Sequence, residues 1–384
     1  MPLSEDDRDR EAPHGIGLAL SGGGYRAMLF HVGVLLRLNE MGLLRRLDRV
    51  SSVSGGSITA GVLAMNWTKL NFQPTAGDVR VATNLDALLV APIRRLASET
   101  LDARSIVGGA LVPGWSIGDF VAARYDKLLF HGATLQDLPT DEQGPRFVIN
   151  ATSVQTASLV RFSRPYLADY KVGKIPNPRI PLATAVAASS AFPPVLSPVT
   201  IDVDPSSFEP DPEAPLHKLP YTDTLVLSDG GVYDNLGLET IQKHNAVVLV
   251  SDAGGKIDPE PHPATNWAEH SKRVLDIIDD QVRNLRKRWL IDEFKDQRLA
   301  GTYWGIRTDM TDLNLPSALP APYPQTLALA EMPTRLKALP ELQQNRLMNW
   351  GYAVCDAAVR THVATLLPAT VTAPQSFPFP GGVG

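Results

Sequence analysis

The sequence predicts an α/β protein in which helices flank a central, mostly parallel β-sheet. Near the start of the chain, a strand, a glycine-containing turn and a helix follow one another twice. Residues 15–22 form a short apolar run that ends in glycines, and apolar residues recur at helical spacing from 25 to 41. A second strand over 49–53 precedes a second helix that begins near residue 58. This alternation is typical of parallel strand–helix units.

The rest of the chain predicts further elements separated by less regular stretches. Residues 85–118 predict a packed helix or, alternatively, a lid or an interfacial helix, with Leu88–Leu96 as a membrane-contact surface. The other predicted elements are a hairpin over 147–151 and 158–162, strands at 224–227 and 246–250 around a helical stretch at 236–243, a long, charge-rich amphipathic helix over 263–297, a proline-rich loop over 309–335 and a final helix over 337–367. No internal repeat or composition shift marks a boundary. We expect one domain with insertions over 15–367, between a flexible N-terminus (1–14) and a flexible Pro/Gly-rich tail (368–384).

The composition excludes several classes of protein. Of the 384 residues, 44% are hydrophobic and 20% are charged, as in globular rather than disordered chains. The net charge of −5 lacks the basic footprint of a nucleic-acid binder. The lone cysteine, Cys355, allows no internal disulfide, and no Cys/His cluster has the spacing of a zinc site.

Targeting signals do not appear in the sequence either. The charged N-terminus lacks the apolar run of a signal peptide, and no stretch reaches the roughly 18 uninterrupted apolar residues of a membrane span. We therefore expect a soluble, cytoplasmic protein whose contact with any membrane is peripheral.

A glycine-rich turn, Ser21 to Ala27 (Ser-Gly-Gly-Gly-Tyr-Arg-Ala), follows the first predicted strand. Glycines let the backbone turn tightly and expose N–H groups beside a helix N-terminus, where they bind an anion or stabilise a developing oxyanion. The turn also fits the dinucleotide fingerprint G-x-G-x-x-G/A, which requires an acidic residue at the end of the second strand. Because the sequence has Ser54 there, with Asp48 on the far side of the strand, we favour the anion or oxyanion loop.

A second small-residue turn, Ser52-Val-Ser-Gly-Gly56, follows the second strand. A nucleophile elbow has the pattern G-x-S-x-G because its central residue lies on a strained strand-to-helix turn between small neighbours. Ser54 would be that central residue, and Ser52 replaces the first glycine with another small side chain. Such clusters also occur in ordinary turns, so the elbow gains weight mainly from the glycine loop one strand–helix unit earlier.

A third turn, Ser228-Asp-Gly-Gly231, follows the strand at 224–227. Asp-Gly turns are frequent in proteins. At the sheet edge that Ser54 occupies, however, Asp229 could also accept the serine proton. An ordinary carboxylate is too weak a base for this step, so burial would have to raise its pKa and a short hydrogen bond would have to orient it.

These motifs resemble, in order, the motifs of the patatin-like phospholipases. The segments that carry the resemblance are Ser21–Met28, Val53–Ser57 and Asp229–Gly231, supported by Asn150–Phe162 and Ala187–Pro194. The first segment is also similar to the group IV cytosolic phospholipases. The resemblance spans about residues 15–255. It implies a three-layer patatin-like fold and a serine–aspartate dyad, without histidine, that cleaves lipid acyl esters.

The resemblance also implies roles for individual residues. Ser54 matches the nucleophile and Asp229 the base; Gly22, Gly23 and Gly24 match the oxyanion loop; Ser52, Gly55, Gly56, Gly230 and Gly231 belong to the elbow and the aspartate turn; Arg26 matches a basic residue that would meet a lipid phosphate or pair with a structural carboxylate. Ala27 stands where many patatins have glycine. The expected substrate is a lipid or another acyl ester, presented at a membrane or micelle surface, with no cofactor and no nucleic acid.

Two other functions remain as alternatives. A Ser–Asp–His triad of the α/β-hydrolase type would draw its histidine from His244, His262 or His270, which follow Asp229 without a motif around them. A catalytically inactive lipid-binding module would have kept the fold, although the intact serine and aspartate argue against it. We expect His31 to pack within its helix, Asp252 to cap a turn and Cys355 to be an inert core residue.

Overall fold

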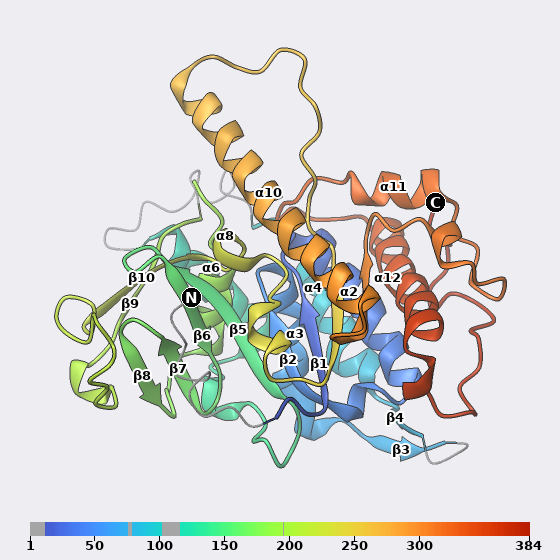
Figure 1. Cartoon of the computed structure of the whole chain (residues 1–384), viewed down its shortest axis with the longest axis horizontal. Coiled ribbons are helices and arrows are strands. Elements are labelled where there is room, and N and C mark those ends of the chain that lie inside the picture. Colours follow the sequence, from blue (N-terminus) through green and yellow to red (C-terminus); the bar gives the residue numbers. More distant parts are fainter. Residues whose placement is uncertain (1–11, 76–78, 102–115, 195) are drawn as a thin grey trace.

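The computed structural model describes residues 12–75, 79–101, 116–194 and 196–384. In these residues a ten-stranded mixed sheet forms the centre of the molecule (Figure 1). Its order is β12-β11-β1-β2-β5-β6-β7-β8, and β10 and β9 attach beside β5 off this path. Helices cover both faces of the sheet, which confirms the predicted three-layer α/β fold.

The element bounds follow the predicted pattern closely near the N-terminus. The strands are β1 (Ile16–Leu20), β2 (Leu47–Ser52), β5 (Arg146–Ser153), β6 (Ser158–Phe162), β7 (Tyr166–Asp169), β8 (Gly173–Pro176), β9 (Val199–Asp202), β10 (Thr224–Asp229), β11 (Val247–Asp252) and β12 (Ala300–Gly305), with a separate β3 (Phe72–Pro74) and β4 (Arg80–Ala82) pair. The helices are α2 (Gly24–Glu40), α3 (Gly55–Asn66), α4 (Ala91–Ala97), α6 (Ile117–Tyr125), α7 (Leu182–Ser189), α8 (Gly231–Asp234), α9 (Glu239–Gln242), α10 (Trp267–Lys295), α11 (Tyr323–Ala330) and α12 (Glu341–His362).

The sheet has a parallel half and an antiparallel half. From β12 to β5 every neighbouring pair is parallel, whereas β6, β7 and β8 continue from β5 as antiparallel strands. The parallel strands are buried on both faces, as their apolar sequences require. Leu18 and Leu20 of β1 pack into the larger core on the side of α2 and α12. Ala19, between them, joins a smaller core with Val248 of β11 and Leu290 of α10.

One strand, β5, pairs with both β2 and β10 along the same edge. Its first half pairs in parallel with β2, where Ser52 lies opposite Ile149. Its second half pairs antiparallel with β10, where Asp229 lies opposite Ala151. Because the two strands run toward each other along β5, their carboxyl ends meet in the middle of the sheet.

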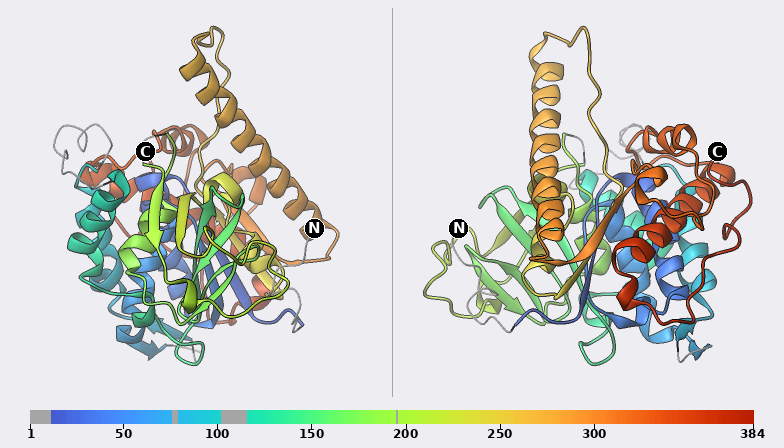
Figure 2. Two further views of the ribbon diagram at one scale, coloured as in Figure 1. Left: turned by 90° about the vertical axis from the view of Figure 1, so that its left-hand side faces the viewer. Right: turned by 45° about the vertical axis from the view of Figure 1, so that its right-hand side comes forward.

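The long helix predicted over 263–297 is α10. Its C-terminal half lies against β12 and α8, whereas its N-terminal half projects from the body of the molecule (Figures 1 and 2). The segment after β11 rises beside the helix and returns at its N-terminus (Figure 1).

The described part of 85–118 fits the packed-helix prediction, because Leu89, Ile93 and Leu96 are buried. Residues 102–115, where a lid was a further possibility, lie outside the described residues, as do 1–11 of the N-terminus. None of the helices in the described residues is both long enough and apolar enough to cross a bilayer.

Two predictions near the C-terminus differ from the structure. The proline-rich stretch 309–335 contains α11, because Pro324 lies in its first turn, where proline is compatible with a helix. The tail after residue 368 lies against α12 rather than free of it. The Asn349 amide donates to the carbonyls of Phe379 (2.9 Å) and Gly382 (2.8 Å), and Val383 is buried.

Candidate active site

Ser54 occupies a strained turn between β2 and α3. Its backbone has φ 51° and ψ −119°, a conformation that side-chain-bearing residues rarely adopt. The helix begins immediately after it and passes so close to the glycine loop that no side chain fits. A Cβ on Gly55 would lie 2.2 Å from the Gly24 carbonyl oxygen, and one on Gly56 would lie 2.4 Å from that of Leu20. These contacts explain why glycines follow the serine.

A buried polar network holds this turn in place. The Ser54 N–H donates to Ser189 Oγ (3.0 Å), whose hydroxyl donates to the Asn150 carbonyl (2.6 Å). The Asn150 amide in turn donates to the Ser52 carbonyl (2.9 Å) at the end of β2. Ser189 comes from α7 and Asn150 from β5, so three elements fix the position of the serine. Sequence reasoning noticed both segments but assigned these two residues no role.

Asp229 lies at the end of β10, fully buried beside the turn. Its Oδ1 accepts a hydrogen bond from the Gly231 N–H (2.7 Å). Its Oδ2 is buried and makes no hydrogen bond of ordinary geometry among the described residues. Burial raises the pKa of this carboxyl to about 7, while the Gly231 N–H and the nearby Ser54 hydroxyl act to lower it and the charge of Asp279 acts to raise it. Such a carboxylate can accept a proton near neutral pH.

The three loop glycines have different hydrogen bonds. The Gly22 N–H donates to the Asn235 carbonyl (3.1 Å) and is therefore already paired. The N–H groups of Gly23 and Gly24 have no partner among the described residues, and both glycines line the same cavity as Ser54. Gly23 (φ 142°) and Gly24 (φ 59°) adopt conformations that favour glycine. Two free donors therefore lie at the positive end of α2, where negative charge is stabilised.

The cavity that contains these residues has a volume of about 580 Å³. Its apolar wall comes mainly from the segment after α7 and from 333–336. The apolar lining residues are Phe192, Pro193, Pro194, Leu196, Ile257, Pro333 and Leu336. Its charged side comes from α10 and neighbouring loops, through Lys256, Lys272, Asp276, Asp279, Asp280 and Arg335. No local sequence pattern indicated that α10 or Asn235 would line this cavity.

A family model for the patatin-like phospholipases matches residues 18–241, more than half of the chain. The chain belongs to this family. The match covers the three turns that surround the cavity and most of the sheet.

Two known proteins resemble this patatin-like chain. Over 93% of its length it superposes on 63% of human GIVD cytosolic phospholipase A2, with a TM-score of 0.51 and 14% identity, a likeness of fold. Over 45 residues it is 47% identical to the putative meiotic phospholipase SPO1 of Saccharomyces cerevisiae. That match covers 12% of the chain and 7% of the yeast protein, so both relatives are considerably longer.

Arg26 lies beside the glycine loop of the patatin-like domain but does not line the cavity. Its Nη1 donates to the carbonyls of Ala330 (2.8 Å) and Met332 (2.6 Å), and its Nη2 donates to that of Ala253 (3.0 Å). Burial lowers its pKa to about 10. These bonds connect α2 to the end of α11 and to the segments after α11 and β11, so they favour a structural role for Arg26. Its partners are backbone carbonyls, whereas the structural alternative predicted a carboxylate. The lipid-phosphate contact stays a prediction that these bonds do not support.

None of the candidate histidines of a triad lines the cavity with Ser54. His31 is buried between Ser251 Oγ (2.9 Å) and the Ser21 carbonyl (3.0 Å), as predicted for a packed helix residue. Burial lowers its pKa to about 4, so it is neutral. His262 and His270 are exposed before and within α10, and His244 lines a different cavity.

The two remaining predictions agree with the structure. Asp252 accepts a hydrogen bond from the Gly254 N–H (2.8 Å), as in a turn, and Cys355 is buried in α12.

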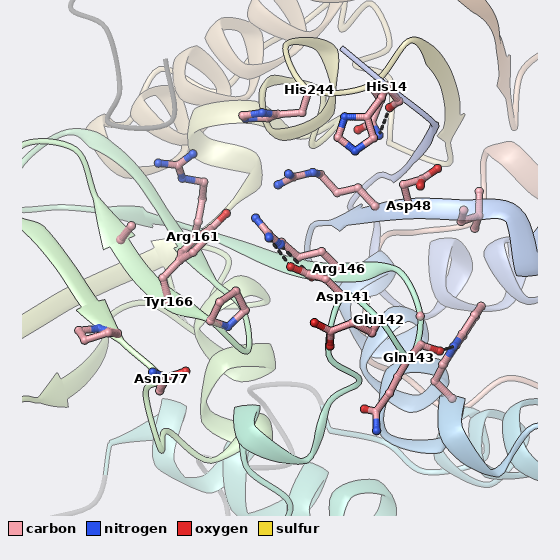
Figure 3. A pocket seen from close by; sticks show the side chains of 18 of the residues that line it. His14, Asp48, Asp141, Glu142, Gln143, Arg146, Arg161, Tyr166, Asn177 and His244 are labelled. Carbon is pink, nitrogen blue, oxygen red and sulfur yellow. Dashed lines mark hydrogen bonds and ion pairs between the residues drawn. The ribbon is translucent and has the colours of Figure 1, made fainter. Parts of the chain in front are cut away.

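A second, larger cavity of about 1010 Å³ lies at the opposite edge of the sheet (Figure 3). It is bordered by residues at the amino ends of β1, β2, β5 and β11, and its lining is mostly charged or polar. Arg146 forms an ion pair with Asp141 there, and Lys174 lies 3.1 Å from Glu209. Among the described residues that line it there is no serine, threonine or cysteine.

Proposed function

We propose that this chain is a lipid acyl hydrolase in which Ser54 attacks the ester carbonyl and Asp229 accepts the serine proton. The observation that carries the proposal is the juxtaposition of a strained serine and a buried carboxylate whose pKa is raised to about 7. A serine hydroxyl is a weak nucleophile unless a base takes its proton, and here no histidine is in place to do so.

The unpaired N–H groups of Gly23 and Gly24 support an oxyanion hole. As Ser54 Oγ bonds to the carbonyl carbon, the carbonyl oxygen becomes negative and these two amides stabilise it. Gly22 takes no direct part, because its N–H is already bonded to Asn235.

The reaction then proceeds in two halves. Protonated Asp229 returns the proton to the departing alcohol or lysolipid, which leaves the acyl group on Ser54. Asp229 next removes a proton from the water that attacks the acyl ester, and it gives this proton to Ser54 Oγ as the fatty acid is released. The same amides stabilise the second tetrahedral intermediate.

The walls of the cavity support an acyl chain as the bound group. Phe192, Leu196 and Leu336 present apolar surface next to the serine, whereas the charged residues lie toward α10. Family membership points in the same direction, because the family is named for phospholipases. Carboxylic ester hydrolysis is therefore the reaction class that we propose.

The test is hydrolysis of p-nitrophenyl esters of increasing chain length and of fluorescent phospholipid vesicles. We expect wild-type turnover that is lost in both Ser54→Ala and Asp229→Asn, with melting temperatures that show folded protein. Asp252→Asn is the matched control, because Asp252 is also a buried carboxylate at the end of a strand but does not line the cavity.

Two outcomes would contradict the proposal. If Asp229→Asn keeps its activity, Asp229 is not the base and the histidines must be replaced in turn. If the folded wild type hydrolyses no ester, the chain is a binding module rather than an enzyme.

A further inference from the structure

α10 presents a stripe of large apolar side chains to solvent. Leu275 is 62% exposed and Leu285 58% exposed, and the stripe comprises Leu275, Ile278, Val282, Leu285 and Trp289. Trp267, Val274 and Ile277 are also exposed. A continuous exposed apolar surface on a water-soluble helix marks a site of interaction.

Several charged residues of α10 lie on the side that faces the body of the molecule. Arg283 is buried, 3.2 Å from Asp280, and Lys272 and Asp276 line the active-site cavity. An ordinary surface helix turns its apolar side inward. The reversed orientation of α10 therefore leaves its apolar side for a partner.

The spacing of the stripe indicates that the partner is another helix. Its five members are separated by three, four, three and four residues, which is the a and d pattern of a heptad repeat. In this assignment Leu275, Val282 and Trp289 occupy a positions, and Ile278 and Leu285 occupy d positions. Val274 and Ile277, at neighbouring g and c positions, widen the exposed apolar surface on one side of this seam.

The charges beside the seam match a second copy of the same helix. The four e positions are Lys272, Asp279, Arg286 and Glu293, whose signs alternate along the helix. In an antiparallel pair, e positions face e positions. When Val282 packs against the partner's Leu285, Lys272 faces the partner's Glu293 and Asp279 faces the partner's Arg286. Two-fold symmetry repeats both pairs, so all four are attractive.

Other arrangements lack this match. A shift by one heptad in one direction places Asp279 opposite the partner's Asp279, and a shift in the other direction places Arg286 opposite the partner's Arg286. A parallel pair brings e positions beside g positions, which are Val274, Gln281 and Arg288. Only Arg288 would then meet an opposite charge.

The shape of the molecule fits the same arrangement. The N-terminal half of α10 projects from the body of the molecule, and its apolar stripe is exposed (Figures 1 and 2). An antiparallel partner would lay the C-terminal half of its own α10 against it. Arg286 lies 3.6 Å from Glu239 and 3.8 Å from Asp234, and its guanidinium has five N–H donors, so it can contact an additional carboxylate. We propose that the chain forms a symmetric homodimer through antiparallel pairing of α10.

The first test is the mass of the full chain in solution, measured by light scattering and sedimentation. We expect a dimer for the wild type and a dissociation constant raised roughly 100-fold or more for Val282→Glu, which places two charges in the seam. Leu342→Glu is the matched control, because Leu342 is 48% exposed on another helix. No turnover is measured, so failure here leaves the proposed hydrolysis unaffected.

The second test addresses orientation and register. Lys272→Glu and Glu293→Lys should each weaken self-association, and an equimolar mixture of the two variants should restore a dimer. Chains with Ile278→Cys and Trp289→Cys, when mixed, should form a disulfide, whereas Ile278→Cys with Val282→Cys should not. Buried Cys355 contributes little background.

Several outcomes would overturn the proposal. A wild type that stays monomeric at high concentration would do so, as would a dimer that Val282→Glu leaves intact. A monomer that binds phospholipid vesicles through the stripe, with binding lost in Val282→Glu, would identify a lipid surface as the occupant instead.

Discussion

The two edges of the central sheet carry cavities of opposite character. The cavity at the amino ends of the parallel strands is nearly twice as large and is lined by charged and polar side chains, several of them in ion pairs (Figure 3). The smaller cavity, where β2 and β10 meet, combines apolar walls with Ser54 and Asp229. In the first, charges neutralise one another. In the second, burial raises the pKa of a carboxyl group.

The comparison shows that volume is a poor guide to chemistry in this molecule. Ligands of parallel α/β sheets bind outside the carboxyl ends of the strands, and the smaller cavity follows that rule. A strained backbone, a buried carboxylate and unpaired amides occur together only there among the described residues. These features store free energy that folding elsewhere must offset, which favours a functional explanation for them.

The largest expected effect separates the two cavities directly. Ser54→Ala should lower kcat/KM for a phenyl ester by about 10⁴-fold or more, because loss of a nucleophile leaves only binding and oxyanion stabilisation. Arg49→Ala, at the larger cavity, should leave kcat/KM within about twofold. Steady-state kinetics on both variants checks this, and a comparable loss in both would remove the distinction.

The next effect concerns the glycine loop. Gly23→Ala should lower kcat by about 10²–10³-fold, the usual cost of a lost oxyanion donor, because a Cβ would lie 2.6 Å from the Ala253 carbonyl and displace the loop. Gly255→Ala is the control within the same cavity, since its Cβ would meet no atom closer than 3.5 Å. Equal losses in kcat for the two variants would argue against Gly23 as a donor.

The third effect is a pH dependence of both rate and stability. Only ionised Asp229 can accept a proton, so kcat/KM should rise about tenfold per pH unit below about 7 and level off above it. Folding raises this pKa from 3.8, so the native state retains a proton that the unfolded chain releases. Stability should therefore fall as pH rises from about 4 to 7 and stay reduced above that.

Asp229→Asn removes this penalty and should raise the melting temperature relative to wild type most strongly above pH 7. Thermal unfolding from pH 5 to 9 measures the difference. A pH-independent difference between the two proteins would contradict the raised pKa.

The smallest effect comes from α10. Asp279 is one of the groups that raise the pKa of Asp229, although burial is the larger cause. Asp279→Asn should therefore shift the midpoint of the rate–pH profile down by a few tenths of a unit. Asp276→Asn, one helical turn earlier, is the control and should leave the midpoint in place.

Local sequence patterns predicted the parts of the site that local structure creates. Apolar runs, glycines and helical spacing located β1, α2, β2 and α3, and the turns between them hold Ser54 and the glycine loop. The Asp-Gly turn after β10 indicated Asp229 as a candidate base, and the family resemblance then implied that role. The raised pKa was expected on chemical grounds, because an ordinary carboxylate could not act as the base.

The remaining parts depend on contacts between distant segments. Ser189 lies 135 residues from Ser54, and no periodicity reports such a contact. Arg26 was assigned to a phosphate or a carboxylate, whereas its partners are carbonyls of residues more than 200 positions away. The packing of the tail depends likewise on the Asn349 amide, which a Pro/Gly-rich composition does not reveal.

The shared strand β5 has a consequence for how the chain can vary. The segment between Ser153 and Leu227 begins and ends at residues that lie opposite each other in β5 and β10. Both ends of this excursion are therefore fixed, and within it α7 holds Ser54 through Ser189. Loops of this excursion that lie outside its strands and α7, such as 204–222, can thus gain or lose residues without moving the serine relative to the aspartate. They are places where new segments can enter the chain while the site keeps its geometry.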